Sequence, residues 1–278
     1  MVLGLVSALS WGAGDFGGGL ITRRAPLFGV VGMTQLVGMV AALGLGILLA
    51  EPFPSAPDIG WAVIGGLCGV VGITSLYRGL AVGRMGVVAP VTGVLSATVP
   101  VAFGFLTEGL PAPATVVGIG VALVAVVLVT RTPGEGTDRP SGIRWALIAG
   151  MAIGLFNICV GQFSGDSAFG LLVIVRLVQA LALGIVIVVG RQPWRLPPDV
   201  VPKLVVVGLL DMAGNAAFIL AAQAGDLAIA AVLSSLYPVV TVLLAITILR
   251  ENLTRSHVVG IALTGAAIAL IAGGAAAG

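Results

Sequence analysis

Long apolar runs dominate the chain, and their length limits what it can fold into. A helix needs about 20 mostly apolar residues to cross a bilayer, and ten such runs follow one another at 2–22, 27–50, 59–80, 85–106, 113–130, 143–163, 168–190, 203–223, 227–249 and 256–274. Charged residues make up only 9 % of the chain, against about 25 % in soluble domains. A soluble globule of this composition would expose large apolar patches. The sequence therefore predicts an all-α integral membrane protein with ten transmembrane helices.

The second half of the chain repeats the first. A shift of 142 residues places glycines of one half on glycines of the other, as in the pairs Gly12 and Gly154, Gly66 and Gly208, and Gly72 and Gly214. A repeat with a period near half the chain length indicates two similar structural units. We therefore expect one five-helix repeat in residues 1–130, a linker in 131–142 and a second five-helix repeat in 143–278.

The charged residues in the breaks between runs predict the topology. Loop Lys and Arg residues follow only odd-numbered runs: Arg23, Arg24, Arg84, Arg131, Arg139, Arg144, Arg191, Arg195, Lys203, Arg250 and Arg255. In the breaks after even-numbered runs, all charged residues are acidic: Glu51, Asp58, Glu108, Asp166 and Asp226. Because positive loops stay in the cytoplasm, we expect the breaks after odd-numbered runs inside and both termini outside.

The same charges predict how the halves are related. Five spans per half is an odd number, so the second half enters the membrane upside down and equivalent loops lie on opposite sides. Their charges should then be swapped, and they are: the shift of 142 residues pairs Arg24 with Asp166, Arg84 with Asp226 and Glu108 with Arg250. Inverted-topology repeats are typical of secondary transporters, which bind substrate at the repeat interface.

The repeated segments resemble a known family. The relevant residues are Trp11-Gly12, Leu233-Ser234-Ser235-Leu236-Tyr237-Pro238, Arg250-Glu251-Asn252-Leu253 and Val259-Gly260-Ile261-Ala262-Leu263. They are similar to the EamA-type module of the drug/metabolite transporter superfamily, and the resemblance covers nearly the whole chain, with the module occurring twice. It implies a ten-helix carrier of small metabolites or drugs. Members are usually drawn with both termini in the cytoplasm, whereas the charges here predict the reverse.

A carboxylate in the first run is the leading candidate for the substrate site. A charge inside a bilayer costs about 2.5–3.5 kcal/mol on the insertion scale, so Asp15 needs a reason to be there. Trp11 lies one turn earlier on the same helix face, and the repeat equivalent of Asp15 is Asn157. We expect these residues to line the substrate cavity, with Asp15 pairing a cation or carrying a proton. Alternatively, Asp15 caps a helix broken at the neighbouring glycines.

A second polar group breaks the symmetry of the repeat. Asp211 and Asn215 are four residues apart and share one helix face, and Arg176 lies deep inside the run 168–190. The planar guanidinium of an arginine can hold a carboxylate or phosphate of a substrate. The alternative is that Arg176 forms an ion pair with Asp211 and serves the structure. Gln35 is expected to make a hydrogen bond between helices.

Further residues are candidates with structural alternatives. Three side chains are candidate substrate contacts or simple packing hydrogen bonds: Tyr77, Ser234 and Tyr237. Three prolines are candidate hinges or static bends: Pro90, Pro100 and Pro238. Each removes a backbone hydrogen bond if it lies within a helix.

These features predict a secondary transporter, an exporter or exchanger that moves a small metabolite or drug-like solute across the cytoplasmic membrane. A flippase for a lipid or lipid-linked sugar is the alternative. No Gly-x-Ser-x-Gly, His-Glu-x-x-His or Cys-x-x-Cys motif occurs, so we expect no enzyme, catalytic residue or metal site. We expect no cofactor, with proton or sodium coupling left open. Expected partners are the solute and membrane lipid, without nucleic acid, in a monomer or homodimer.

Overall fold

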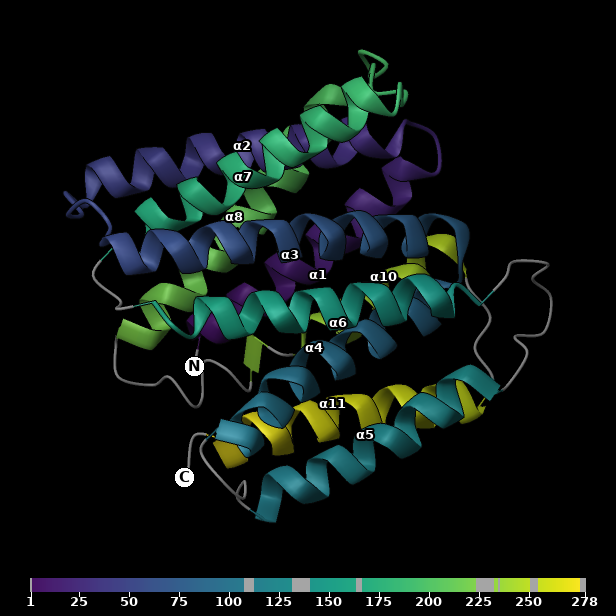
Figure 1. Ribbon diagram of the computed structural model, residues 1–278. Helices are drawn as coiled ribbons and strands as arrows, with labels where there is room; N and C mark the ends of the chain where they lie inside the picture. Colours follow the sequence, from purple (N-terminus) through teal and green to yellow (C-terminus); the bar gives the residue numbers. More distant parts are fainter. Residues whose placement is uncertain are drawn as a thin grey trace.

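The fold is known from a computed structural model that describes residues 2–107, 113–131, 141–163, 167–223, 233–234, 236–250 and 255–275. Within these residues every regular element is an α-helix. The helices of the first half are α1 (Val2–Thr22), α2 (Leu27–Leu48), α3 (Ala56–Val82), α4 (Met85–Thr107) and α5 (Pro113–Arg131). Those of the second half are α6 (Ile143–Val160), α7 (Ala168–Val189), α8 (Val201–Gln223), α10 (Tyr237–Leu249) and α11 (Arg255–Ala275) (Figure 1).

The helices agree with the predicted apolar runs to within a few residues. In the run 227–249, α10 accounts for the part from Tyr237 onward, while 224–232 and 235 lie outside the described residues. Within the described ranges, six helices are long and apolar enough to cross a membrane: α2, α3, α4, α6, α7 and α8. The prediction of an all-α, multi-pass membrane protein is therefore confirmed.

Helix ends follow ordinary capping rules. Ser55 caps α3 by accepting a hydrogen bond from the backbone N of Asp58 at 3.3 Å, an arrangement that satisfies one of the free N–H groups of the first turn. Pro238 lies in the first turn of α10, where a proline removes no internal hydrogen bond. Pro238 therefore does not lie in the interior of a helix as predicted, and its role as a hinge stays a prediction. Pro90 and Pro100 do lie inside α4, as predicted.

Helices of one half pack mainly against helices of the other. α1 packs against α8 and α10, and α6 packs against α3 and α4. α2 contacts α7 and α8, whereas α7 contacts α2 and α3. α5 and α11 lie side by side at one edge of the bundle (Figure 1). The two halves are thus interleaved rather than separate.

α2 and α7 run antiparallel along their shared face. A Cβ added at Gly38 would lie 2.8 Å from Cζ of Arg176, whereas one at Gly46, two turns further on, would lie 3.8 Å from the backbone N of Gly170. Later residues of α2 therefore face earlier residues of α7, so the two helices run in opposite directions.

α5 and α11 are antiparallel as well. A Cβ added at Gly118 would lie 2.9 Å from the backbone N of Ile271, and one at Gly274 would lie 2.7 Å from that of Thr115. Glycines at these positions let the two backbones approach closely, as in other membrane helix pairs.

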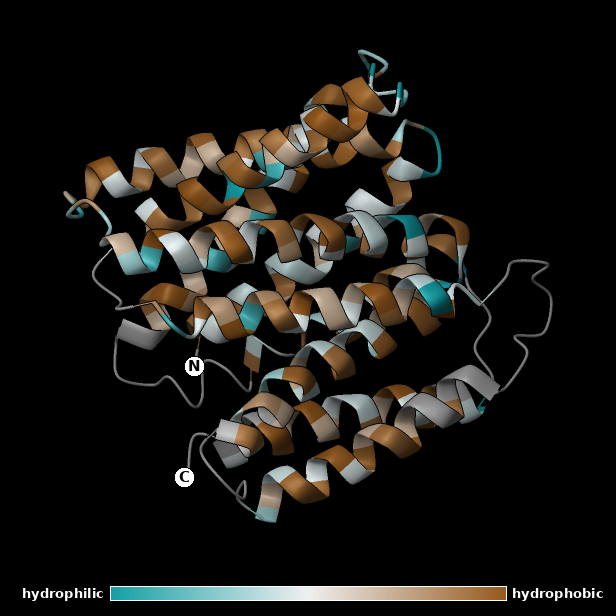
Figure 2. Ribbon diagram, in the orientation of Figure 1, coloured by the Kyte–Doolittle hydropathy of each residue, from teal (hydrophilic) through white to brown (hydrophobic). Residues whose placement is uncertain are grey.

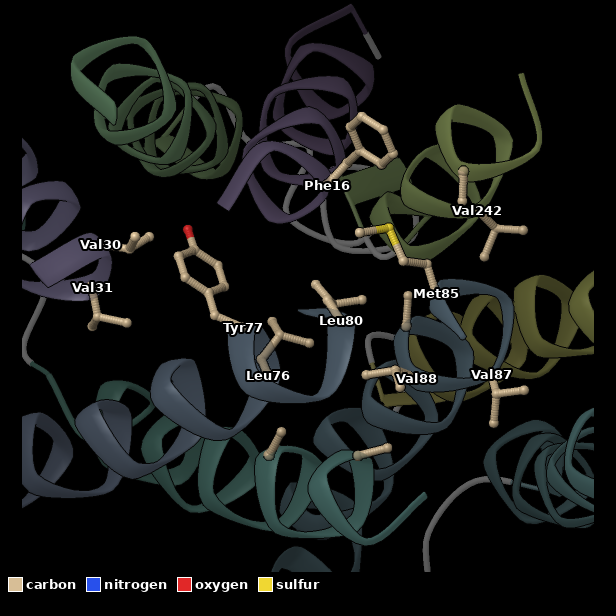
Figure 3. Close-up of a cluster of buried hydrophobic side chains, with 14 of the residues drawn as sticks. Phe16, Val30, Val31, Leu76, Tyr77, Leu80, Met85, Val87, Val88 and Val242 are labelled. Carbon is tan, nitrogen blue, oxygen red and sulfur yellow. The ribbon is translucent and has the colours of Figure 1, made fainter. Parts of the chain in front are cut away.

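The main buried cluster joins both halves. Phe16 of α1 packs near Tyr77 and Leu80 of α3 and Met85 of α4, with Val242 of α10 close by (Figure 3). In lipid, burial of such side chains gains little from the hydrophobic effect, so close packing stabilises the bundle instead. Apolar residues also cover the outward faces of the helices, where lipid replaces water as the solvent (Figure 2).

Candidate functional site

Small residues bring α1 and α8 together at the centre of the bundle. A Cβ added at Gly14 would lie 3.7 Å from the backbone N of Asp211, and one at Gly17 would lie 2.9 Å from Cγ2 of Val207. Because the backbones are this close, the carboxylate of Asp15 is near that of Asp211, and the two interact electrostatically. The α1–α8 contact therefore holds two carboxylates in one region.

Three aromatic rings from three helices lie together beside Asp15. The ring centroid of Trp11 is 6.0 Å from that of Phe218 on α8, with a tilt of 35°. It is 6.2 Å from the ring of Tyr237 on α10, which it meets edge-on at 82°. Gly214 leaves room for the indole, since a Cβ there would lie 2.5 Å from Cδ1 of Trp11. Pairs in these geometries stabilise by about 0.5–1.5 kcal/mol beyond burial, so the cluster holds its rings in place.

Asp15 is half-buried and, among the described residues, accepts no hydrogen bond. It interacts electrostatically with Asp211 of α8, Tyr77 of α3 and Tyr237 of α10. It therefore lies where helix α1 meets three others. α1 is one unbroken helix over Val2–Thr22, so the alternative that Asp15 caps a broken helix is wrong.

Arg176 on α7 binds two other helices. Its Nη2 donates to Oδ2 of Asp211 and its Nη1 donates to Oε1 of Gln35 on α2. The Arg176 side chain is 7 % exposed and that of Asp211 is 31 % exposed. The structural alternative, an ion pair with Asp211, is therefore confirmed, as is the expected helix–helix hydrogen bond of Gln35. Asp211 is thus paired with a cation, whereas Asp15 has no ionic partner among the described residues.

The ion pair leaves polar atoms unused. Nε of Arg176 and Oε1 of Gln179, one turn further along α7, are buried and have no hydrogen-bond partner among the described residues. Gln179 points at α3, where Gly69 leaves space for its amide. The polar face of α7 therefore has one donor and one acceptor that the surrounding helices do not satisfy.

Tyr77 joins three helices. It is 2 % exposed, its ring lies against α1 at Gly18, and its side chain interacts with that of Thr34 on α2. Figure 3 shows the ring between α3 and the valines of α2. These contacts make Tyr77 part of the packing around Asp15.

Asn157, the repeat equivalent of Asp15, has a structural partner. Its Nδ2 donates to the backbone O of Ser96 at 3.2 Å. Pro100 lacks the N–H that would otherwise bond this carbonyl four residues earlier in α4. Asn157 therefore satisfies the carbonyl that Pro100 leaves free.

The remaining predicted residues lie around this centre. The side chain of Asn215 donates to the backbone O of Asp211 at 2.8 Å. The side chain of Tyr237 interacts with that of Ser96, and Ser234 is buried. No hydrogen bond or ion pair within the described part of the chain joins Asp15 to Asn157, and the expectation that both line one cavity stays a prediction.

The second half of the chain matches a family model. Residues 140–273 match the EamA-like transporter family, part of the drug/metabolite transporter superfamily. The EamA-like half begins at the end of the predicted linker and includes helices α6, α7, α8, α10 and most of α11.

Two further comparisons give the same picture of the fold. An uncharacterized protein of Methanocaldococcus jannaschii is 29 % identical over 134 residues, which are 47 % of this chain and 95 % of that protein. This relative is therefore about half as long as the present chain. A crystal structure of another protein aligns with a TM-score of 0.61 and 18 % identity over 96 % of both chains, so the fold extends across both halves.

Sequence reasoning missed two residues. Phe218 in the EamA-like half lies seven residues after Asp211, on the helix face that also carries Gly214, and that spacing is visible in the sequence. Glu51 was assigned only as a loop charge. It accepts hydrogen bonds from the backbone N of Phe169 at 3.0 Å and of Gly170 at 2.9 Å, capping α7 from the other half of the chain, which no local pattern indicates.

Proposed function

We propose that the protein is a secondary transporter, an exporter or exchanger that moves a small metabolite or drug-like solute across the cytoplasmic membrane by alternating access. The observation that carries this proposal is the state of Asp15. It is a half-buried carboxylate without a hydrogen-bond partner among the described residues, at a junction of helices α1, α3, α8 and α10. The match of residues 140–273 to a transporter family supports the same conclusion.

The cost of Asp15 favours a role in binding. A carboxylate inside a membrane costs about 2.5–3.5 kcal/mol on the insertion scale. Arg176 offsets that cost for Asp211, whereas nothing described offsets it for Asp15. A charge that the fold leaves uncompensated fits a group that binds a solute or a coupling proton or sodium ion. In this proposal Trp11, Tyr237 and the Asp211 carboxylate contact the solute.

Other predicted residues have supporting roles in the proposal. The amide of Asn215 extends the polar face of α8 beyond Asp211. Arg176 fixes the charge of Asp211, and Tyr77 holds α3 against α1. Asn157 is bonded to α4 and Ser234 is buried, and neither is proposed to contact the solute.

Equivalent contacts in the two halves support an inverted repeat of residues 1–130 and 143–278. A Cβ added at Gly66 would lie 2.8 Å from Cβ of Val178 on α7. One added at Gly208, the repeat equivalent of Gly66, would lie 2.8 Å from Cβ of Val37 on α2. The α3–α7 and α8–α2 contacts are therefore the same contact made twice.

The direction of the helices supports an axis in the membrane plane. α2 and α7 are equivalent in the repeat and run antiparallel, as do α5 and α11. An axis along the membrane normal would leave equivalent helices parallel, whereas a half-turn about an axis in the plane reverses them. This is the architecture in which one repeat rocks against the other around a central site, with Pro90 and Pro100 of α4 as proposed hinges.

The topology that follows from the charges has its own test. In a variant with Cys68 and Cys159 replaced by serine, single cysteines are introduced as Gly278→Cys and Gly136→Cys, at positions outside the described residues. A membrane-impermeant thiol reagent on intact cells should label the tail and not the linker. The reverse labelling would overturn the orientation but leave the inverted repeat intact.

Uptake into proteoliposomes tests the transport function. Purified protein is reconstituted and supplied with a panel of labelled amines, amino acids, sugars, carboxylates and lipid-linked sugars, under imposed proton or sodium gradients. We expect saturable movement of at least one water-soluble solute above protein-free vesicles. Movement of only the lipid-linked compounds would favour a flippase, and no movement of any compound would contradict the proposal.

A further inference from the structure

We infer that the central site takes an organic cation, whose positive charge pairs with Asp15 and whose apolar body lies against the rings of Trp11, Phe218 and Tyr237. The inference rests on the proposed transport function and names the class of solute.

The charged side chains at the centre indicate whether the ligand is a cation or an anion. The charged side chains that interact at the centre are Asp15, Asp211 and Arg176. Arg176 is bound to Asp211, and Gln35 takes another of its donors. Among the described residues, one carboxylate, that of Asp15, therefore remains without an ionic partner. An anion brought here would be repelled by the ionised form of this carboxylate in a medium that screens poorly. A cation would neutralise the site.

The aromatic residues fit the same ligand. Trp11 lies one turn before Asp15 on the same face of α1, and its ring meets Phe218 and Tyr237 at two different angles, 35° and 82°. Ring faces attract ammonium groups, with Trp the strongest of the aromatic side chains. All three rings are half-buried, as is Asp15, so each keeps surface that a ligand can contact. A carboxylate beside rings that face different directions is a site for an alkyl- or arylammonium group.

The repeat provides an internal comparison for this assignment. At the equivalent place in the other half, Ile153 takes the position of Trp11 against Gly72, and Asn157 takes the position of Asp15. Neither the charge nor the ring is present there. The cation site is therefore built by residues that differ between the halves, on a backbone contact that the halves share.

Equilibrium binding to the purified full chain in detergent tests the inference without requiring transport. Two matched pairs serve as probes: 2-phenylethylammonium with 2-phenylethanol, and choline with its uncharged isostere 3,3-dimethylbutanol. Phenylalanine and 3-phenylpropanoate add a zwitterion and an anion. We expect at least one cation to bind about tenfold or more tighter than its neutral isostere, and 3-phenylpropanoate to bind most weakly.

Three variants locate the binding. Asp15→Asn should remove the preference for the cation while leaving binding of its neutral isostere unchanged, and Trp11→Ile should weaken both members of the pair. Asp199→Asn, the same chemical change at an exposed loop carboxylate, should alter neither. The elution volume and thermal unfolding of each variant verify that it is folded.

The opposite results are equally definite. If no cation binds more tightly than its isostere, or if Asp15→Asn keeps the preference, the inference is wrong. Tighter binding of phenylalanine than of 2-phenylethylammonium would also overturn it, because Arg176 would then bind the carboxylate of the ligand. Cation binding that depends on Asp15 without any uptake in proteoliposomes would instead contradict the transport function and leave the cation site intact.

Discussion

The two halves of the chain share their backbone contacts and differ in the side chains that fill the centre. Gly72 of α3 makes room for Ile153 of α6, and Gly214 of α8 makes room for Trp11 of α1. These two contacts are equivalent under the shift of 142 residues, yet one holds an aliphatic residue and the other an aromatic ring. The small residues define a common scaffold, and the residues packed against them differ in chemistry.

The polar residues show the same contrast more strongly. Asp15 corresponds to Asn157, which satisfies a backbone carbonyl of α4. Asp211 corresponds to Gly69, and the nearest repeat equivalent of Arg176 is Gln35, a neutral amide that accepts a hydrogen bond from Arg176. A symmetric scaffold places two equivalent residues around the centre, whereas a solute without symmetry needs two different ones. Because the charged residues of the two halves differ, the centre can distinguish one end of a solute from the other.

Breaking the ion pair should have the largest effect on stability. Asp211→Asn leaves the guanidinium of Arg176, which is 7 % exposed, without its counter-charge. We expect a loss of about 3 kcal/mol in the free energy of unfolding, near the lower end for such changes because Asp211 is partly exposed. Denaturant unfolding in detergent micelles measures it.

The matched control is Asp15→Asn, the same substitution at a carboxylate without an ionic partner in the described chain. It should leave stability equal or improved, because it removes an uncompensated charge. Equal losses for the two variants would show that the two carboxylates do not differ as the structure indicates.

Substitutions in the shared scaffold should have intermediate and equal effects in the two halves. A methyl group added by Gly66→Ala or Gly208→Ala would meet a valine Cβ at 2.8 Å in both cases. Overpacking of this kind costs about 1–3 kcal/mol, and thermal unfolding should report similar losses. At Gly44 a Cβ would meet nothing within 4 Å, so Gly44→Ala should be neutral or stabilise through its higher helix propensity. A loss at only one of the two equivalent glycines would argue against the inverted repeat.

The smallest effect concerns the amide of Asn157. Asn157→Ala removes the donor to the carbonyl of Ser96 and should cost about 1 kcal/mol. Pro100→Ala returns the backbone N–H that this carbonyl lacks. In that background Asn157→Ala should cost clearly less, which a double-mutant cycle of unfolding free energies would detect. An equal cost in both backgrounds would show that Asn157 does not compensate for Pro100.

The sequence predicts the helices well because membrane thickness sets their length. The ten runs and the short breaks between them identify the bounds of most helices to within a few residues, since an apolar run must end where lipid ends. The start of α10 is different, because Tyr237 lies inside an apolar run and no change in composition marks the boundary. For the same reason the sequence places Pro238 in the interior of a helix, whereas it lies in the first turn of α10.

The candidate site was predictable only in part. Helical spacing relates Trp11 to Asp15, and charge alone makes an Arg176–Asp211 pair a reasonable alternative. No periodicity, however, indicates which helices face each other across the bundle. The bond from Asn157 to Ser96 and the cap that Glu51 provides for α7 depend on contacts between residues far apart in the chain, which one sequence does not specify.

Turnover of the Asp15→Asn variant is the most direct test of the account. Once the proteoliposome panel identifies a solute, its uptake is measured for the wild type, Asp15→Asn and the exposed-carboxylate control Asp199→Asn at equal amounts of folded protein. We predict that Asp15→Asn loses at least about tenfold in turnover, with unchanged or improved thermal stability, while Asp199→Asn transports like the wild type. Wild-type turnover in Asp15→Asn would contradict the claim that this one asymmetric charge is at the centre of transport.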